Sequence, residues 1–293
     1  MNRDPLARRE AQLDALCGRH HVGGQTARER DGSAAARTAP GRQLGHAGID
    51  LVAVDHHHVN AVDECENRPG TSTGDEAAGP GEEVEHQALN TLRTGGFREG
   101  GVARGGQARQ KRFDEAAELL RRAVAIQERV FGKAHPRVAS AVNDLGSVAL
   151  QRGDLDEAEA AFTRMADVYQ SVYGAKHYLI GIAISNLASV YVARQEFTRA
   201  EPLYRQAIAL YEETQSPQHM NTGIGRIKLG RALVGQARYD EAEVEILAGY
   251  EILTKQTSPS VSWLRSARED LVKLYTASNQ PDKAKRFEAE LRQ

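Results

Sequence analysis

The sequence predicts an all-α fold for residues 113–293, a solenoid of antiparallel helical hairpins. Two observations predict it. In this part of the 293-residue chain the same residue types return every 42 positions, and within each period apolar residues recur at the three- and four-residue spacing of a helix. A fixed period of this length indicates one supersecondary unit stacked on copies of itself. The clearest series are Ala116, Ala158, Ala200, Ala242 and Ala284, and Leu145, Leu187, Leu229 and Leu271.

Residues 1–112 have a different composition. They hold 17 of the 27 glycines and 7 of the 10 histidines, but no Tyr and no Trp. With so few large apolar side chains, this segment cannot offset the entropy of ordering a backbone, roughly 1–2 kcal/mol per residue. We therefore expect 1–112 to be largely disordered, apart from a short helix after Asp4-Pro5 and another from about Val84 to Arg93.

Two interpretations of residues 1–112 remain open. The segment is either a genuine disordered arm or a non-native product of a misassigned start or a shifted reading frame. Enrichment in Arg, Ala, Gly and His, with Lys111 as the single lysine, is typical of a shifted frame in a GC-rich gene. The 42-residue period also stops here, because counting back from Leu145 and Gly146 reaches Ala103 and Arg104 in a Gly/Arg run. The array is therefore predicted to begin with half a hairpin.

The first complete unit shows how the residues specify a hairpin. Pro136 begins a helix, where its missing N–H costs nothing, and Gly153 ends that helix in a turn. Asp154 then caps the next helix, with Glu157 three residues later in a capping-box pattern. The two apolar stripes are Val138, Val142, Leu145 and Ala149, and Leu155, Ala158, Phe162, Met165 and Val168.

The later units copy this pattern. We expect nine helices in 113–293: an unpaired one near 113–131, then four hairpins that start near residues 136, 178, 220 and 262. A small residue is expected where the two helices of a hairpin meet, opposite a large one, because a void or a clash costs about 1–5 kcal/mol. The last helix, 281–291, is more polar and suits a solvent-facing cap. The small–large pairs are Gly146 and Phe162, Ala188 and Tyr204, and Gly230 and Ile246.

These residues resemble the tetratricopeptide repeat, whose units carry a leucine–small pair, a later alanine and a large apolar residue at these offsets. The resemblance covers about 113–293 and implies a right-handed α-solenoid. The 42-residue unit, with Val130-Phe131-Gly132-Lys133-Ala134-His135-Pro136 and Val172-Tyr173-Gly174-Ala175-Lys176-His177, is similar to the kinesin-light-chain variety.

A narrower resemblance concerns the end of the chain. Ala248-Gly249-Tyr250-Glu251, Asp270-Leu271-Val272-Lys273-Leu274-Tyr275 and Asp282-Lys283-Ala284 are similar to the repeat-bearing C-terminal tail of bacterial serine/threonine kinases. The sequence contains no Gly-rich phosphate loop, His-Arg-Asp or Asp-Phe-Gly kinase motif.

The histidines do not predict a metal or catalytic site. His135, His177 and His219 lie 42 positions apart, so successive hairpins separate them by on the order of 10 Å and they cannot share an ion at about 2 Å. We interpret them as residues that shape the loop before each hairpin. His56-His57-His58, with His46 and Cys65 nearby, lacks the paired spacing of zinc ligands and is interpreted as an adventitious cluster. We expect no catalytic residue, no metal and no cofactor.

The family geometry implies a peptide-binding groove on the inner face of the first helices. Small polar and aliphatic residues predominate on this face, which suits an extended peptide or a loop of another protein. The Lys/Asn set with which chaperone-binding relatives bind a C-terminal carboxylate is not matched. The implied groove residues are Ser140, Asn143, Ser147, Leu150, Ser185, Ser189, Val192, Ile227, Arg231, Val234, Glu269 and Lys273.

Charge and composition narrow the partner class. Residues 1–112 carry 15 basic and 16 acidic side chains, and residues 113–293 carry 23 and 24, so the basic patch typical of nucleic-acid binding is absent. No apolar run approaches the ~20 residues that span a bilayer, and we expect no secretory signal, because the first residues lack an apolar core. We expect a cytoplasmic, non-enzymatic module that binds protein or peptide, and neither nucleic acid nor membrane. The alternative is the regulatory or sensor tail of a larger signalling enzyme such as a kinase.

Overall fold

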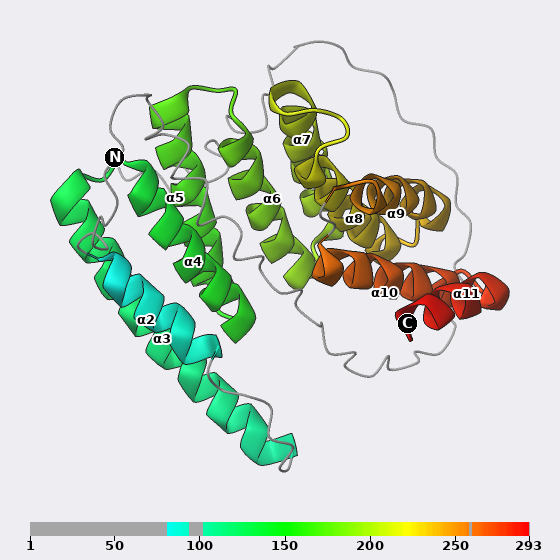
Figure 1. Ribbon diagram of the computed structural model, residues 1–293, viewed down its shortest axis with the longest axis horizontal. Coiled ribbons are helices and arrows are strands. Elements are labelled where there is room, and N and C mark those ends of the chain that lie inside the picture. The colour runs from blue at the N-terminus through cyan, green and yellow to red at the C-terminus, as the bar shows by residue number, and fades with distance from the viewer. Residues whose placement is uncertain (1–80, 94–101, 258–259, 293) are drawn as a thin grey trace, which may run out of the picture. The chain divides into compact units, whose positions relative to one another are not determined.

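The structure is a computed structural model, and it describes residues 81–93, 102–257 and 260–292. Every element in these ranges is an α-helix, without a strand, which confirms the all-α prediction (Figure 1). All of them lie in one compact unit. The helices are α2 Glu82–Arg93, α3 Val102–Phe131, α4 Pro136–Arg152, α5 Leu155–Tyr173, α6 Tyr178–Ala193, α7 Phe197–Thr214, α8 Met220–Gly235, α9 Tyr239–Thr254, α10 Val261–Ala277 and α11 Pro281–Leu291.

The helices pair in chain order, each packing on the next (Figure 1). Four hairpins, α4–α5, α6–α7, α8–α9 and α10–α11, start at residues 136, 178, 220 and 261. The predicted starts are therefore confirmed to within one residue. The first helix of each hairpin also contacts the second helix of the preceding one, so the apolar stripes are covered on both sides. The fold is an α-solenoid.

The predicted caps and turns are present. The Asp154 carboxylate accepts a hydrogen bond from the Glu157 backbone N–H at 3.2 Å, and Gly153 has a φ of 83°. The three residues at the same place in later hairpins also have a positive φ, although none is glycine: Gln195 at 63°, Ala237 at 58° and Asn279 at 57°. The shape of this turn is therefore set by the packing of the hairpin and not by glycine alone.

The small–large contacts are as close as expected. A Cβ added at Gly146 would lie 2.8 Å from Phe162 Cε1, and one added at Gly230 would lie 2.3 Å from Ile246 Cγ1. Ala188 is fully buried. These distances leave no room for a larger side chain, since real Cβ contacts stay near or above 3.4 Å. The small residue therefore determines how closely the two helices of a hairpin approach.

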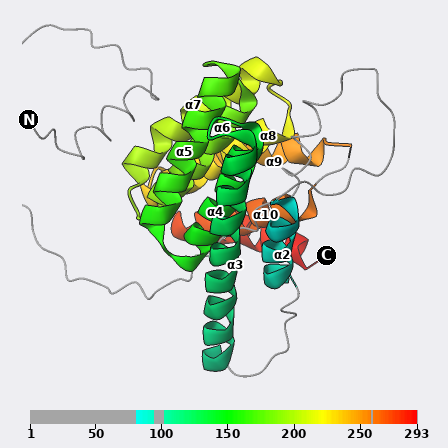
Figure 2. The same ribbon diagram turned by 90° about the vertical axis from the view of Figure 1, so that its left-hand side faces the viewer.

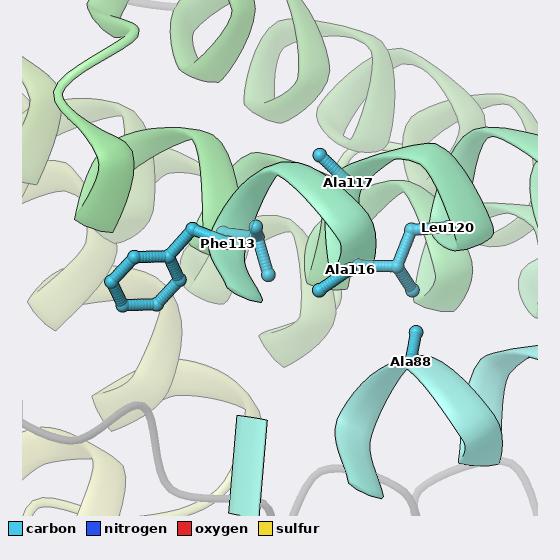
Figure 3. Close-up of a cluster of buried hydrophobic side chains, with 6 residues drawn as sticks. Ala88, Phe113, Ala116, Ala117 and Leu120 are labelled. Carbon is cyan, nitrogen blue, oxygen red and sulfur yellow. The ribbon is translucent and has the colours of Figure 1, made fainter. Parts of the chain in front are cut away.

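The prediction of an unpaired helix near 113–131 is wrong. Helix α3 already begins at Val102, and α2 packs beside it (Figure 2). Ala88 of α2 is fully buried against α3, as Figure 3 shows, in a cluster that also includes Val148 of α4. The α3 residues in this cluster are Phe113, Ala116, Ala117 and Leu120.

Helix α2 supplies the first half of the first hairpin. Gly81, just before α2, lies against Gln127 near the end of α3, whereas Ala88 points toward Leu120 (Figure 3), so the two helices are antiparallel. Ala88 precedes Leu120 by 32 positions, while Gly146 precedes Phe162 by 16. Because the connection between α2 and α3 is longer than in the later hairpins, the residues of α2 do not fall on the 42-residue spacing, and the spacing does not predict this helix. The helix expected from about Val84 to Arg93 is confirmed, but as a packed part of the array.

Several predictions fall outside the described residues. These are the helix after Asp4-Pro5, and the cluster of His46, His56 to His58 and Cys65. The boundary between 112 and 113 falls inside α3. Disorder and a non-native reading frame thus stay predictions for residues 1–80, and the structured array starts at least as early as residue 81.

Candidate functional site: the first-helix face

The candidate site is the face formed by the first helix of each hairpin, α2, α4, α6, α8 and α10, which we call the first-helix face. Neighbouring first helices are joined across it by polar side chains. Asn186 Nδ2 donates to Asn143 Oδ1 at 2.9 Å, and Lys228 Nζ lies 3.5 Å from Ser185 Oγ. At the last junction, the Arg231 guanidinium donates to the Asp270 carboxylate. We call these junction contacts the polar ladder.

The first junction contains the same kind of contact. There the carboxylate of Glu85 on α2 faces that of Asp144 on α4. Glu85 therefore takes the place that Asn143 and Ser185 take in later hairpins. Glu85 and Asp144 are 59 positions apart, compared with 43 at the next two junctions, and this excess equals the one between Ala88 and Leu120. Two independent contacts thus assign α2 to the first-helix position.

Sequence reasoning missed five of the eight residues of the polar ladder. Four of its members, Asp144, Asn186, Lys228 and Asp270, lie 42 positions apart, and all four are polar or charged. This regularity was available as a signal, because a polar residue repeated in every unit of an otherwise apolar helix needs a partner. The sequence analysis used only the periodic apolar residues and the periodic histidines, and not these periodic polar residues.

The structure divides the twelve predicted groove residues into buried and accessible ones. Ile227 is fully buried with Leu253, Trp263 and Ala267, so its assignment to a ligand-binding surface is corrected. Its neighbours α9 and α10 cover it, which the family register cannot reveal. Asn143, Ser147, Leu150 and Ser185 are also buried. The accessible ones are Ser140, Ser189, Val192, Arg231, Val234, Glu269 and Lys273.

Some of these polar residues have partners within the chain. Ser147 Oγ donates to the Asn143 carbonyl of its own helix at 2.8 Å, and Ser189 Oγ lies 3.0 Å from the Tyr204 hydroxyl. Glu269 accepts a hydrogen bond from Arg265 Nε at 3.1 Å. Lys273 is exposed.

Arg231 is part of the scaffold. Its guanidinium binds both Asp270 and Ser266 of α10 and lies 5.9 Å from the centre of the Trp263 ring. Burial raises the pKa of the Asp270 carboxyl, and the neighbouring Arg231 opposes that rise. Breaking a buried ion pair leaves an uncompensated charge. A substitution of Arg231 is therefore expected to affect the fold as well as the first-helix face.

The three periodic histidines cap the first helices. Nδ1 of His135, His177 and His219 accepts a hydrogen bond from the backbone N–H two residues later, at 3.2, 3.3 and 3.1 Å. The His135 ring stacks on Phe131, and the His177 ring stacks on Tyr173. Partial burial lowers the pKa of all three imidazoles, and Arg137 lowers that of His135 further. These contacts agree with our interpretation that the histidines shape the loop before each hairpin.

Two features are absent from the described residues. Within 81–93, 102–257 and 260–292, no three His, Cys, Asp or Glu side chains are grouped so that they could hold a metal ion. None of the helices in those ranges has the length and apolar content to cross a bilayer.

Comparison with known proteins identifies the repeat. The family model for the tetratricopeptide repeat matches residues 107–171, 140–213 and 179–255, which together span just over half of the chain. No curated protein matches the sequence.

Solved structures agree in fold. The nearly identical TPR-like repeats of a kinesin light chain from Podosopora anserina are 20% identical to this chain, with a TM-score of 0.54 over 74% of this chain and 96% of that one. BtubC (BKLC) from P. vanneervenii is 16% identical, with a TM-score of 0.54 over 72% and 87%. At these identities the likeness shows the fold alone.

Proposed function

The chain belongs to the tetratricopeptide repeat family, and on that premise we propose that it is a non-catalytic module that binds a protein or peptide segment along the first-helix face. Such repeats are scaffolds typical of protein–protein interaction. The observation that carries the proposal is the set of accessible residues on this face. It extends over four successive first helices, from Ser140 on α4 to Lys273 on α10.

The accessible residues suit an extended segment. The hydroxyl group of Ser140 can bond backbone groups of a peptide in either direction, and Val192 and Val234 offer aliphatic contact area. Lys273 adds an exposed positive charge for an acidic side chain or a terminal carboxylate. The polar ladder lies between these residues and fixes the spacing of the helices that present them. A rigid surface loses less entropy on binding.

A double substitution tests the proposal with a partner recovered by affinity purification on the full chain. We choose Val192→Asp with Lys273→Glu, because both residues are accessible and they lie on α6 and α10. Binding should weaken by about 1–3 kcal/mol, measured by calorimetry, since a desolvated contact and a charge-assisted bond are lost. Circular dichroism and the melting temperature should barely change.

The matched control carries the same charge changes on second helices. Arg122→Glu on α3 and Ala209→Asp on α7 alter two exposed residues, so partner affinity should be unchanged. The proposal fails if the control pair abolishes binding while the first-helix pair leaves it intact.

The alternative stays a prediction from the sequence: a regulatory tail of a larger signalling enzyme, with its catalytic domain elsewhere. An upstream reading frame that encodes a kinase domain in phase with this chain would favour it. Partner identity and a cytoplasmic location stay predictions as well.

A further inference from the structure

The first junction of the polar ladder differs chemically from the others. Later junctions pair a donor with an acceptor: Asn186 with Asn143, Lys228 with Ser185, and Arg231 with Asp270. At the first junction, Glu85 faces Asp144, and two carboxylates offer only acceptors. The two can form a hydrogen bond with each other only while one of them carries a proton.

The surroundings of the pair provide few donors. Gln127 Nε2 of α3 donates to Glu85 at 2.9 Å, and Asn143 Nδ2 lies 3.3 Å from Asp144 Oδ1. The other amide atom of Gln127, Oε1, is buried and has no hydrogen-bond partner among the described residues. The site is thus rich in acceptors on all three helices that form it, so a second ionised carboxylate there is poorly compensated.

The charged groups that face the pair do not neutralise it. On α2, Glu82 adds a negative charge, although it is bound to Arg137 of α4, and His86 favours the ionised form of Glu85. The facing residue on α3 is the uncharged Gln127. Burial is the largest cause that raises the pKa of Asp144 well above its usual range, and the neighbouring Glu85 raises it further. Burial likewise raises the pKa of Glu85.

We propose that α2 is a proton-gated cap on the array, which docks on α3 and α4 while Glu85 and Asp144 share a proton and leaves them when both carboxylates are ionised. This inference does not depend on the binding function proposed above. A second feature supports it: α2 is only 12 residues long, and isolated helices of that length are marginal in water. Undocked α2 should therefore lose its helical structure, which makes the change measurable.

The direction of the pH effect follows from proton linkage. The docked state binds the shared proton more tightly than free carboxyl groups do, so docking is favoured at low pH. As the pH rises above the ordinary pKa range of carboxyl groups, the equilibrium constant for docking of α2 on α3 and α4 falls by up to about tenfold per pH unit. The fall ends at the pH where the docked pair itself loses the shared proton. Above that point docking is weak and independent of pH.

Hydrogen–deuterium exchange of the full chain between about pH 5 and pH 9 tests the gate, with rates corrected for intrinsic exchange. We expect the protection of α2 to fall by at least tenfold across this range, while that of α6 stays constant. Glu85→Gln should remove the dependence of α2 on pH, because an amide at position 85 can donate to an ionised Asp144. Asp144→Asn should do the same from the other side of the junction.

Glu82→Gln is the matched control, since it alters a neighbouring carboxylate that is bound to Arg137. It should lower the protection of α2 at every pH and leave the slope unchanged. The proposal is overturned if wild-type α2 is equally protected across the range, or if Glu85→Gln keeps the wild-type slope. It is also overturned if Ca²⁺ alone restores full protection at high pH, because the pair would then be a cation site.

Discussion

The first hairpin, α2–α3, and the third, α6–α7, have the same topology but are held together differently. Eleven of the sixteen residues of α6 are buried, and its polar contacts at both junctions pair donors with acceptors. Helix α2 buries Ala88 completely, but its junction consists of two carboxylates and a glutamine with an unsatisfied oxygen. Two hairpins of the same topology can therefore differ in stability, with a stable hairpin at the centre of the array and a pH-dependent one at its end. This is possible because each hairpin of a solenoid contacts only its neighbours.

Removing a large side chain from each hairpin should test this comparison most strongly. Tyr204→Ala in α7 should lower the free energy of unfolding by about 3–5 kcal/mol, because it opens a cavity in the centre of the array. The equivalent change in the first hairpin is Leu120→Ala, also at a fully buried position. Urea denaturation should show a smaller loss for Leu120→Ala, with exchange of α2 increased instead. An equal global loss for both would mean that the two hairpins unfold as one unit.

The histidine caps should respond to pH in the opposite direction from α2. Their pKa is lowered in the folded chain, so their contribution to stability is present above the unfolded value near 6.5 and is lost as the pH falls through the folded value. Protonation of Nδ1 also removes the acceptor that each cap requires.

The cap of the third hairpin offers a test. His177→Ala should cost about 0.5–2 kcal/mol at pH 8, in the range of N-cap substitutions, and less at pH 5. Thermal melts of wild type and variant at both pH values measure the difference. A cost that does not change with pH would contradict the assigned role of Nδ1.

The smallest expected effect concerns the turns. Ala237→Gly should raise the free energy of unfolding by about 0.5–1 kcal/mol, because glycine adopts a φ of 58° without the steric cost that alanine bears. Gly153→Ala at the equivalent turn should lower it by a similar amount. A stabilising Gly153→Ala would show that the turn relaxes, so that the packing of each hairpin does not determine its φ.

The regular spacing of the repeats was sufficient for most of the fold. It placed four hairpin starts to within one residue, and the small–large pairs at Gly146 and Gly230 meet as expected. It failed at α2, where a longer connection to α3 breaks the count although the contacts of Ala88 and Glu85 are preserved. For the candidate site, the spacing placed the predicted residues on the first helices but did not reveal which side chains are buried or paired, as Ile227 and Arg231 show.

By itself the sequence determined the helices of the four hairpins from residue 136 onward, their order and their pairing, because these depend on local spacing, caps and apolar stripes within a single repeat. The tertiary structure decided which polar residues are accessible, because burial depends on neighbouring helices. Asp270 binds Arg231 from the preceding hairpin, and Asp144 likewise meets Glu85, 59 positions earlier in the chain. The 42-residue spacing cannot predict such contacts between hairpins. The energy of two facing carboxylates depends on their distance in space and on the exclusion of water around them.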